Sequence, residues 1–275
     1  MDAPRNQIFS PSSLNELFSI WKQFPEAVPF AGGTTIACGQ EKEAFNLPPK
    51  ILCLDKLAEL KRITRTERYL EIGSMVKLNN VIWLGKIVPE IITKCLENMA
   101  GTQLRNIATV GGNICCRNFD LTTPMIALDA HYELRSAQTS RWISASRFYS
   151  LTEPENPDSM ELLTRIRVPL DQWDYAVYRK FKNQEIENSE NAVFLMKVQK
   201  NILTDIRVIY KAGTIFRNKN GEAVLIGVRM PLARKNASDF IENWKIYLAQ
   251  QKEISDFSKM KLLNLITLHV YDLCE

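Results

Sequence analysis

The chain has 275 residues, of which 45% are hydrophobic and 24% are charged, and its formal net charge is +4. This composition is typical of a globular protein, and a mild charge spread along the chain does not indicate a nucleic-acid-binding surface. At this length two domains are expected rather than one core. No stretch approaches the ~18 apolar residues of a membrane span, and the N-terminus lacks a signal-peptide core. We therefore expect a soluble, cytoplasmic protein that does not enter a membrane.

Six cysteines and two histidines are the candidate metal ligands. The cysteines form no CxxC pair and lack the spacing of zinc ribbons or ferredoxins; they are Cys38, Cys53, Cys95, Cys115, Cys116 and Cys274. His131 and His269 are too few for a histidine-based metal site or a catalytic triad. The sequence predicts that this chain holds no metal of its own.

Hydrophobic periodicity predicts the elements of the first half of the chain. Ser12 or Ser13 can cap a first helix that ends before Pro25, and Glu16 stands in the capping-box position for Ser13. Buried strands are expected at 27–33 and 50–57, and residues 63–75 favour a hairpin. From Asn79 to Met99 the spacing is helical, with an interruption at Pro89.

In the second half, residues 121–149 begin with a helical pattern and continue with strand-like alternation. Residues 160–170 predict a strand that ends at Pro169, followed by a seam near 169–174. Three strands of a small antiparallel sheet are expected at 174–182, 191–200 and 202–213, and two helices from about Asp239. The segment NKNG at 218–221 is compatible with a hairpin turn or with a loop into a short helix.

The glycines carry the clearest functional signal. Only 11 occur in 275 residues, yet four form two doublets, Gly32–Gly33 and Gly111–Gly112. Each doublet follows strand-like residues and precedes a small polar residue. Consecutive amides without Cβ atoms form a concave nest that binds anions, above all phosphates. Two converging nests suit a diphosphate, to which the side chains of Thr34, Thr35, Thr109 and Asn113 would add hydrogen bonds.

Other interpretations of the doublets remain open at this point. Either doublet could be a tight turn without a ligand. Neither has the GxGxxG spacing of a Rossmann fold or the Gly-Lys-Ser/Thr ending of a phosphate-binding loop. A nicotinamide-binding fold or a nucleotidase is therefore not indicated.

Several segments together resemble a known family. PFAGGTTI, LRNIATVGGNI, the following D…P…ALDA, LLTRIRVP and YRKF occur in the order and near the spacing found in flavin subunits of molybdenum hydroxylases. These are the medium chains of bacterial xanthine dehydrogenases, nicotinate dehydrogenases and aerobic carbon monoxide dehydrogenases. The resemblance implies an α+β fold. An FAD-binding domain of two α/β subdomains (about 1–55 and 56–170) would span residues 1–170, and a C-terminal domain with a small antiparallel sheet plus helices would span 174–275.

The resemblance also implies FAD as the cofactor and a set of contact residues. The family's first flavin loop falls on Pro29, Phe30, Ala31, Gly32, Gly33, Thr34, Thr35 and Ile36, and its second on Thr109, Val110, Gly111, Gly112 and Asn113. Both loops would hold the diphosphate, and Met99 matches a contact residue ahead of the second loop. Asp120 would bond ribityl or ribose hydroxyls, Leu163 would lie beside the flavin, and Lys180 would favour the reduced, anionic flavin. No catalytic residue is implied.

Some of these residues have other interpretations from pattern alone. Asp120 could cap a helix, Leu163 could face a core, and Lys180 could be a surface charge. Arg105 could reach a phosphate or form a surface salt bridge. We also expect Gly32→Val or Gly111→Val to abolish flavin binding by steric exclusion.

The implied function is an FAD-dependent electron-transfer subunit of an oxidoreductase. Its partners would be a large molybdopterin-binding subunit and a small [2Fe–2S] subunit, and electrons would leave to NAD⁺ or another acceptor. Two alternatives remain. A flavin-free structural or assembly subunit is suggested by the segment ICCRNF at 114–119, which is shorter than usual in the family. In the C-terminal domain, YKAGTIF stands where the family usually has a Gly-Gly pair, a change that would affect contacts with a partner. A stand-alone flavin oxidase is the other alternative.

Overall fold

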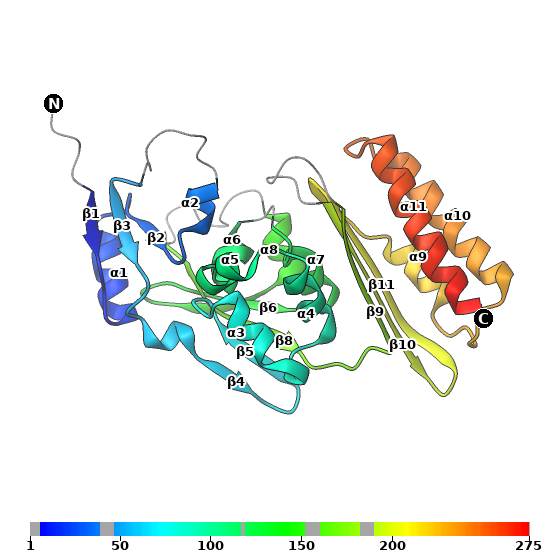
Figure 1. Ribbon diagram of the computed structural model, residues 1–275, viewed down its shortest axis with the longest axis horizontal. Helices are drawn as coiled ribbons and strands as arrows, with labels where there is room; N and C mark the ends of the chain where they lie inside the picture. The colour runs from blue at the N-terminus through cyan, green and yellow to red at the C-terminus, as the bar shows by residue number, and fades with distance from the viewer. Residues whose placement is uncertain (1–5, 39–46, 117–118, 152–159, 182–189, 275) are drawn as a thin grey trace. The chain divides into compact units, whose positions relative to one another are not determined.

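The computed structural model describes residues 6–38, 47–116, 119–151, 160–181 and 190–274, and Figure 1 shows their helices and strands. The chain folds into two compact units. The first, here the N-terminal unit, comprises Met1–Val88, Met99–Arg117 and Leu128–Leu170; the second, the C-terminal unit, comprises Pro89–Asn98, Asn118–Ala127 and Asp171–Glu275. The domain boundary expected near residues 170–174 stays a prediction.

A three-stranded parallel sheet opens the N-terminal unit, in the order β1 (Gln7–Phe9), β3 (Lys50–Cys53), β2 (Val28–Phe30). Helix α1 (Leu14–Gln23) begins where predicted, because the Ser13 hydroxyl accepts the amide of Glu16 over 3.2 Å. The carboxylate of Glu16 bonds the amide and hydroxyl of Ser12 rather than Ser13, so the capping box is displaced by one residue. The apolar face of α1 packs on Leu54, Leu57 and Leu60.

A five-stranded antiparallel sheet forms the rest of this unit's framework. Its order is β4 (Ile63–Arg65), β5 (Tyr69–Gly73), β8 (Leu162–Pro169), β6 (His131–Arg135), β7 (Ser140–Ser144). One face buries Leu70, Ile72, Tyr132, Ile166 and Val168, while the opposite face carries charged side chains. The short helices of this unit are η1 (Ala58–Lys61), α3 (Leu78–Trp83), η2 (Gly85–Ile87) and α8 (Ala145–Ser150). The predicted hairpin and the strand ending at Pro169 are confirmed.

Short helices also surround the two glycine doublets. Helix α2 (Thr34–Cys38) follows the first, and α5 (Thr102–Ile107) and α6 (Val110–Cys115) surround the second. The strand expected before Gly111 is therefore wrong. Only Ala108 and Thr109 are extended, and Thr109 caps α6 by accepting the amide of Gly112. The two β-branched residues Thr109 and Val110 suggested a strand, but Thr109 caps α6 and Val110 is its first residue.

In the C-terminal unit an antiparallel sheet has the order β12 (Thr214–Phe216), β11 (Ile202–Ala212), β10 (Glu190–Gln199), β9 (Tyr175–Phe181). Helices α10 (Arg234–Gln250) and α11 (Asp256–Tyr271) cover one face, and α4 (Glu90–Glu97) and α7 (Thr122–Ala127) lie on the other side (Figure 1). Phe194, Tyr210, Phe240, Trp244 and Leu262 are central to the core between the sheet and α10–α11. The three strands expected here are confirmed.

The open question at residues 218–221 is decided in favour of a helix. Asn218 Oδ1 accepts the amide of Gly221 over 2.9 Å and so starts α9 (Lys219–Leu225). Helix α10 begins at Arg234, earlier than the expected Asp239, and η3 (Asp272–Cys274) follows α11. The α+β class is confirmed. Among the described residues, no helix combines the length and the apolar character that crossing a bilayer requires.

Candidate functional site

The first glycine loop connects the end of β2 to α2. Pro29 and Phe30 belong to β2, Ala31 to Gly33 form the loop, and Thr34 to Ile36 begin α2. Gly33 has φ +68°, a left-handed conformation that L side chains rarely adopt. Within the described residues, the amides of Gly32, Gly33 and Thr34 donate to no acceptor. This loop therefore presents consecutive N–H groups without a partner in the described part of the chain, as an anion-binding nest requires.

The structure brings the two glycine loops together. A Cβ on Gly32 would lie 2.3 Å from the carbonyl oxygen of Ile107 and 3.2 Å from the Cα of Ala108, directly ahead of the second loop. Only a glycine allows this backbone-to-backbone approach. The expectation that two segments remote in sequence converge is correct for the backbone.

The second loop differs from the expected nest. The amide of Val110 donates to Val76 O over 2.9 Å, that of Gly111 to Ser74 O over 2.8 Å, and that of Gly112 to Thr109 Oγ1 over 3.0 Å. These amides are therefore used inside the protein, and the prediction that they are bare is wrong. Helix α6 docks on the β5–α3 connection through them.

The glycines of the second doublet have separate physical roles. A Cβ on Gly111 would lie 2.6 Å from Ser74 Cβ and 2.8 Å from Ser74 O, so this residue permits the close docking of α6. A Cβ on Gly112 would meet only the Thr109 hydroxyl, at 2.9 Å. Neither residue has a positive φ, because both lie in the first turn of a helix.

Met99 and Arg105, which precede the second loop in sequence, form hydrogen bonds with nearby residues. Asn113 Nδ2 donates to Met99 Sδ over 3.4 Å, so two expected contact residues are neighbours. Arg105 donates to the carbonyl of Ala100 over 2.5 Å and to the hydroxyl of Thr102 over 3.3 Å. These contacts hold the turn between α4 and α5.

Lys77 was missed by sequence reasoning. Its ammonium donates to Ile107 O over 2.9 Å, the same oxygen that Gly32 approaches. Its backbone forms an antiparallel bridge with Thr109. Burial lowers the pKa of Lys77, while the carboxylate of Asp55 acts in the opposite direction. A half-buried cation thus stands where the two loops meet. Its neighbours in sequence, Val76 and Leu78, are apolar and gave no signal of this role.

Asp120 and Lys180 lie in the C-terminal unit and contact each other. Lys180 Nζ donates to Asp120 Oδ2 over 2.8 Å. The other carboxylate oxygen of Asp120, which is only 4% exposed, accepts from Tyr178 over 3.2 Å and from Asn191 over 3.3 Å. The structure thus brings these two expected flavin contacts together as an ion pair between a buried carboxylate and a partly exposed ammonium.

Leu163 and the segment 114–119 complete the set. Leu163 pairs with Leu134 across β8 and β6 and is 5% exposed, so it belongs to the sheet's packed interior. Of the shortened segment, Arg117 and Asn118 lie outside the described residues.

Among the residues that the structure does describe, no three or more histidine, cysteine, aspartate or glutamate side chains gather in a possible metal site.

Comparisons with known proteins identify the family to which this chain belongs. Residues 4–171 match the family model described as "FAD binding domain in molybdopterin dehydrogenase". Xanthine dehydrogenase 2 of Arabidopsis thaliana is 26% identical over 245 residues, which are 80% of this chain and 18% of that protein. The carbon monoxide dehydrogenase medium chain of Hydrogenophaga pseudoflava is 25% identical over 236 residues, which are 82% of each chain.

The fold also matches solved structures over its whole length. A chain of carbon monoxide dehydrogenase from Hydrogenophaga pseudoflava superposes with a TM-score of 0.81 and 22% identity, covering 100% of both chains. A chain of quinoline 2-oxidoreductase from Pseudomonas putida 86 gives 0.78 and 20%, covering 100% of this chain and 97% of that one. At these identities the likeness establishes the fold.

Proposed function

Because this chain belongs to the family of FAD-binding domains in molybdopterin dehydrogenases, we propose that it is the electron-transfer subunit of a molybdenum hydroxylase complex. The family resemblance indicated by the glycine loops is thereby confirmed, and so is FAD as the cofactor. The observation that carries the proposal is the first loop. Its three unpaired amides and its left-handed glycine suit the diphosphate of a dinucleotide.

The role of each loop follows from its hydrogen bonds. The amides of Gly32, Gly33 and Thr34 would bind the FAD diphosphate, and the nearby Lys77 would add positive charge. In the second loop Thr109, Val110, Gly111 and Asn113 are buried and only Gly112 is half-buried, so this loop would contribute mainly by its position rather than through its amides. It also fixes the first loop, because Ile107 O lies against Gly32. When bound, the flavin supplies the redox chemistry, so the chain's own residues bind, orient and tune it.

The partners are proposed from the relatives. Relatives named as medium chains include those of carbon monoxide dehydrogenase and glyceraldehyde dehydrogenase. This chain spans only 18% of the first curated relative and 14% of the second. We propose that a large molybdopterin-binding chain carries the hydroxylation site and that a small [2Fe–2S] chain delivers electrons to the FAD. The electrons would leave to NAD⁺ or another acceptor, in the cytoplasm. Asp120, Lys180, Leu163 and Met99 stay predicted contacts of the flavin.

Purification of the tagged full chain from the cells that naturally produce it tests this proposal. We expect flavin, molybdenum and iron to co-elute with it, and a partner's substrate to bleach the flavin absorbance. Elution of the chain alone, or with neither molybdenum nor iron, would contradict the electron-transfer role.

The same experiment separates the alternative of a flavin-free assembly subunit. That function predicts co-elution of molybdenum and iron without flavin absorbance. The three unpaired amides of the first loop favour flavin binding, since an anion-binding nest has no evident use in a purely structural subunit.

A further inference from the structure

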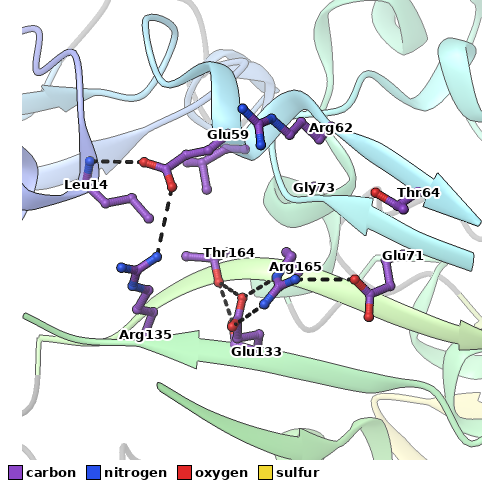
Figure 2. Close-up of a pocket in the computed structure, with 11 residues that line it drawn as sticks. Leu14, Glu59, Arg62, Thr64, Glu71, Gly73, Glu133, Arg135, Thr164 and Arg165 are labelled. Carbon is purple, nitrogen blue, oxygen red and sulfur yellow. Dashed lines mark hydrogen bonds and ion pairs between the residues drawn. The ribbon is translucent and has the colours of Figure 1, made fainter. Parts of the chain in front are cut away.

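A polar cavity of about 220 Å³ lies in the N-terminal unit, apart from the glycine loops. Figure 2 shows η1 and β4 along one side and β6 and β8 along the other. Three arginines and three glutamates line it, so their formal charges cancel. Which of these charges already have partners decides what the cavity can bind.

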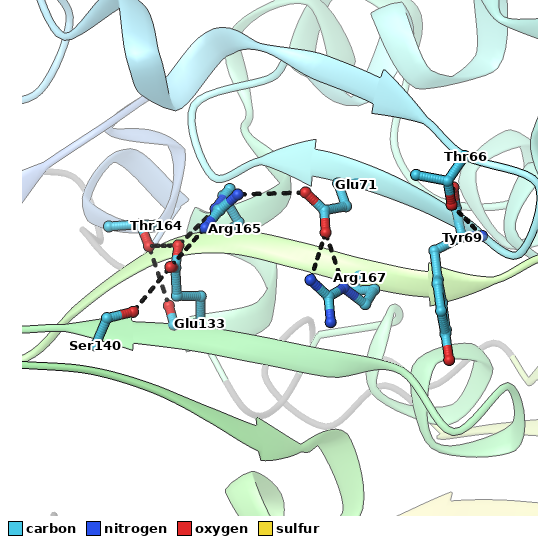
Figure 3. Close-up of polar contacts among 8 residues, drawn as sticks. All are labelled: Thr66, Tyr69, Glu71, Glu133, Ser140, Thr164, Arg165 and Arg167. Carbon is cyan, nitrogen blue, oxygen red and sulfur yellow. Dashed lines mark hydrogen bonds and ion pairs between the residues drawn. The ribbon is translucent and has the colours of Figure 1, made fainter.

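Two of the three carboxylates are fully engaged. Glu133 accepts from Ser140 over 2.8 Å, from Thr164 over 2.6 Å and from two nitrogens of Arg165 over 2.7 Å each. The bond from Arg165 is the main reason that the pKa of Glu133 falls to about 2. Glu71 lies between Arg165 and Arg167, as Figure 3 shows. Arg165 is therefore also engaged.

Two guanidinium groups that line the cavity form no hydrogen bond with the residues that the structure describes. The side chain of Arg62 forms no hydrogen bond or ion pair with any residue that the structure describes. Arg135 meets Glu59 only at 3.9 Å, beyond hydrogen-bond distance. The other oxygen of Glu59 accepts the amide of Leu14 over 3.2 Å. Once the engaged groups are set aside, positive charge exceeds negative.

Paired charges on the open face of an antiparallel sheet need no ligand, because water solvates such faces. Arg62 and Arg135 differ from that pattern, since neither guanidinium has a hydrogen-bonded partner among the described residues, and both line one cavity, Arg62 between η1 and β4 and Arg135 on β6 (Figure 2). Guanidinium groups recognise carboxylate and phosphate oxygens through paired hydrogen bonds. The buried side chains of Leu14 and Leu60 add apolar wall.

We propose that this cavity binds a small organic anion, with its carboxylate or phosphate group between Arg62 and Arg135 and its carbon body against Leu14 and Leu60. The volume lies below the ~300 Å³ at which drug-sized sites begin, so the ligand has metabolite size. None of the lining residues is an expected flavin contact, so binding at this cavity can be measured in the flavin-loaded protein.

Isothermal titration of the full chain with succinate tests the proposal, with inorganic phosphate as a second probe. Arg62→Gln and Arg135→Gln should each weaken succinate binding about tenfold, the usual effect of losing one charge-assisted hydrogen bond. Arg65→Gln is the matched control, because Arg65 lies on the same hairpin but outside the cavity, and it should change nothing. Glu59→Gln keeps an acceptor for Leu14 and removes a negative charge, so it should tighten binding.

Three results would overturn the proposal. The first is no heat of binding with either probe, and the second is an equal loss in Arg65→Gln, which would indicate general surface charge. The third is phosphate binding as tight as succinate binding, because the carbon body would then contribute nothing. Thermal melts of each variant check that the fold is intact.

Discussion

Lys180 Nζ lies 2.8 Å from Asp120 Oδ2, and Asp120 is buried while the Lys180 side chain is 29% exposed. If the ion pair is broken by a mutation, water can therefore replace the missing partner of Lys180 more easily than that of Asp120. An ammonium at partial exposure can be solvated, but a buried carboxylate whose further donors among the described residues are Tyr178 and Asn191 cannot.

This asymmetry makes the first prediction. Lys180→Met should lower the free energy of unfolding by about 3 kcal/mol, since it leaves a buried charge, whereas Asp120→Asn should cost about 1 kcal/mol. Urea denaturation of the flavin-free chain measures both. Equal losses, or a larger loss for Asp120→Asn, would show that the pair is not buried as described.

The second prediction follows from the close approach of the Gly32 backbone to the carbonyl oxygen of Ile107. Gly32→Ala places a Cβ 2.3 Å from Ile107 O, which cannot rotate away, so we expect a loss of about 3 kcal/mol and much weaker FAD binding. Gly32→Val and Gly111→Val should abolish flavin binding, through misplacement of the loops rather than through contact with the flavin alone. Gly112→Ala is the matched control. It meets only the Thr109 hydroxyl and gains helix propensity, so its stability should change by less than ~1 kcal/mol. Thermal denaturation gives the ranking, and a greater loss in Gly112→Ala would refute it.

Lys77 makes the third prediction. Lys77→Gln removes the cation at the meeting point of the loops, so the Kd for FAD should rise about tenfold and become less sensitive to salt. Lys86→Gln, an equal charge change on exposed η2, should leave the Kd unchanged. Flavin fluorescence titrations at two salt concentrations provide the measurement. If both variants bind FAD like the wild type, Lys77 acts only as a tether for Ile107.

Glu133 makes the fourth prediction, on acid stability. Its pKa is held at about 2, below the ordinary 4.5, chiefly by Arg165. A depressed folded-state pKa stabilises the protein fully above pH 4.5, and that contribution is lost as the pH falls from 4.5 toward 2. Glu133→Gln should therefore cost on the order of 3 kcal/mol at pH 7 and progressively less toward pH 2.

Urea denaturation across this pH range measures the effect of Glu133→Gln. Glu90→Gln, which breaks an exposed pair with Lys94 on α4, should cost less than ~0.5 kcal/mol at every pH. A Glu133→Gln effect that is constant with pH would rule out the ionised pair as its cause.

Local sequence signals predicted most of the elements. Ser13 predicted the start of α1, Pro89 predicted the break between α3 and α4, and alternating hydrophobicity predicted β5 and β8. These signals depend only on residues near one another in sequence, so they can be recognised without knowledge of tertiary contacts. The start of α10 was placed too late because its first turn is polar and lacks a capping side chain.

The candidate site was predictable in its location but not in its hydrogen bonding. The two doublets do meet, but their meeting depends on one carbonyl, Ile107 O, which no side-chain pattern reports. Whether an amide is free also depends on tertiary partners: Ser74 O takes the amide of Gly111, while that of Gly32 has no acceptor among the described residues. The role of Lys77 was hidden for the same reason.

The central claim is that the unpaired amides of the first loop bind the diphosphate of FAD. Its most direct test is a competition experiment in which FAD is first bound to chain prepared without flavin. ADP and riboflavin, which represent the two halves of the cofactor, are then added as competitors. The account predicts that ADP, which carries the diphosphate, displaces FAD at far lower concentration than riboflavin, which has no phosphate. Displacement by riboflavin at the lower concentration, or no binding of FAD at all, would contradict it.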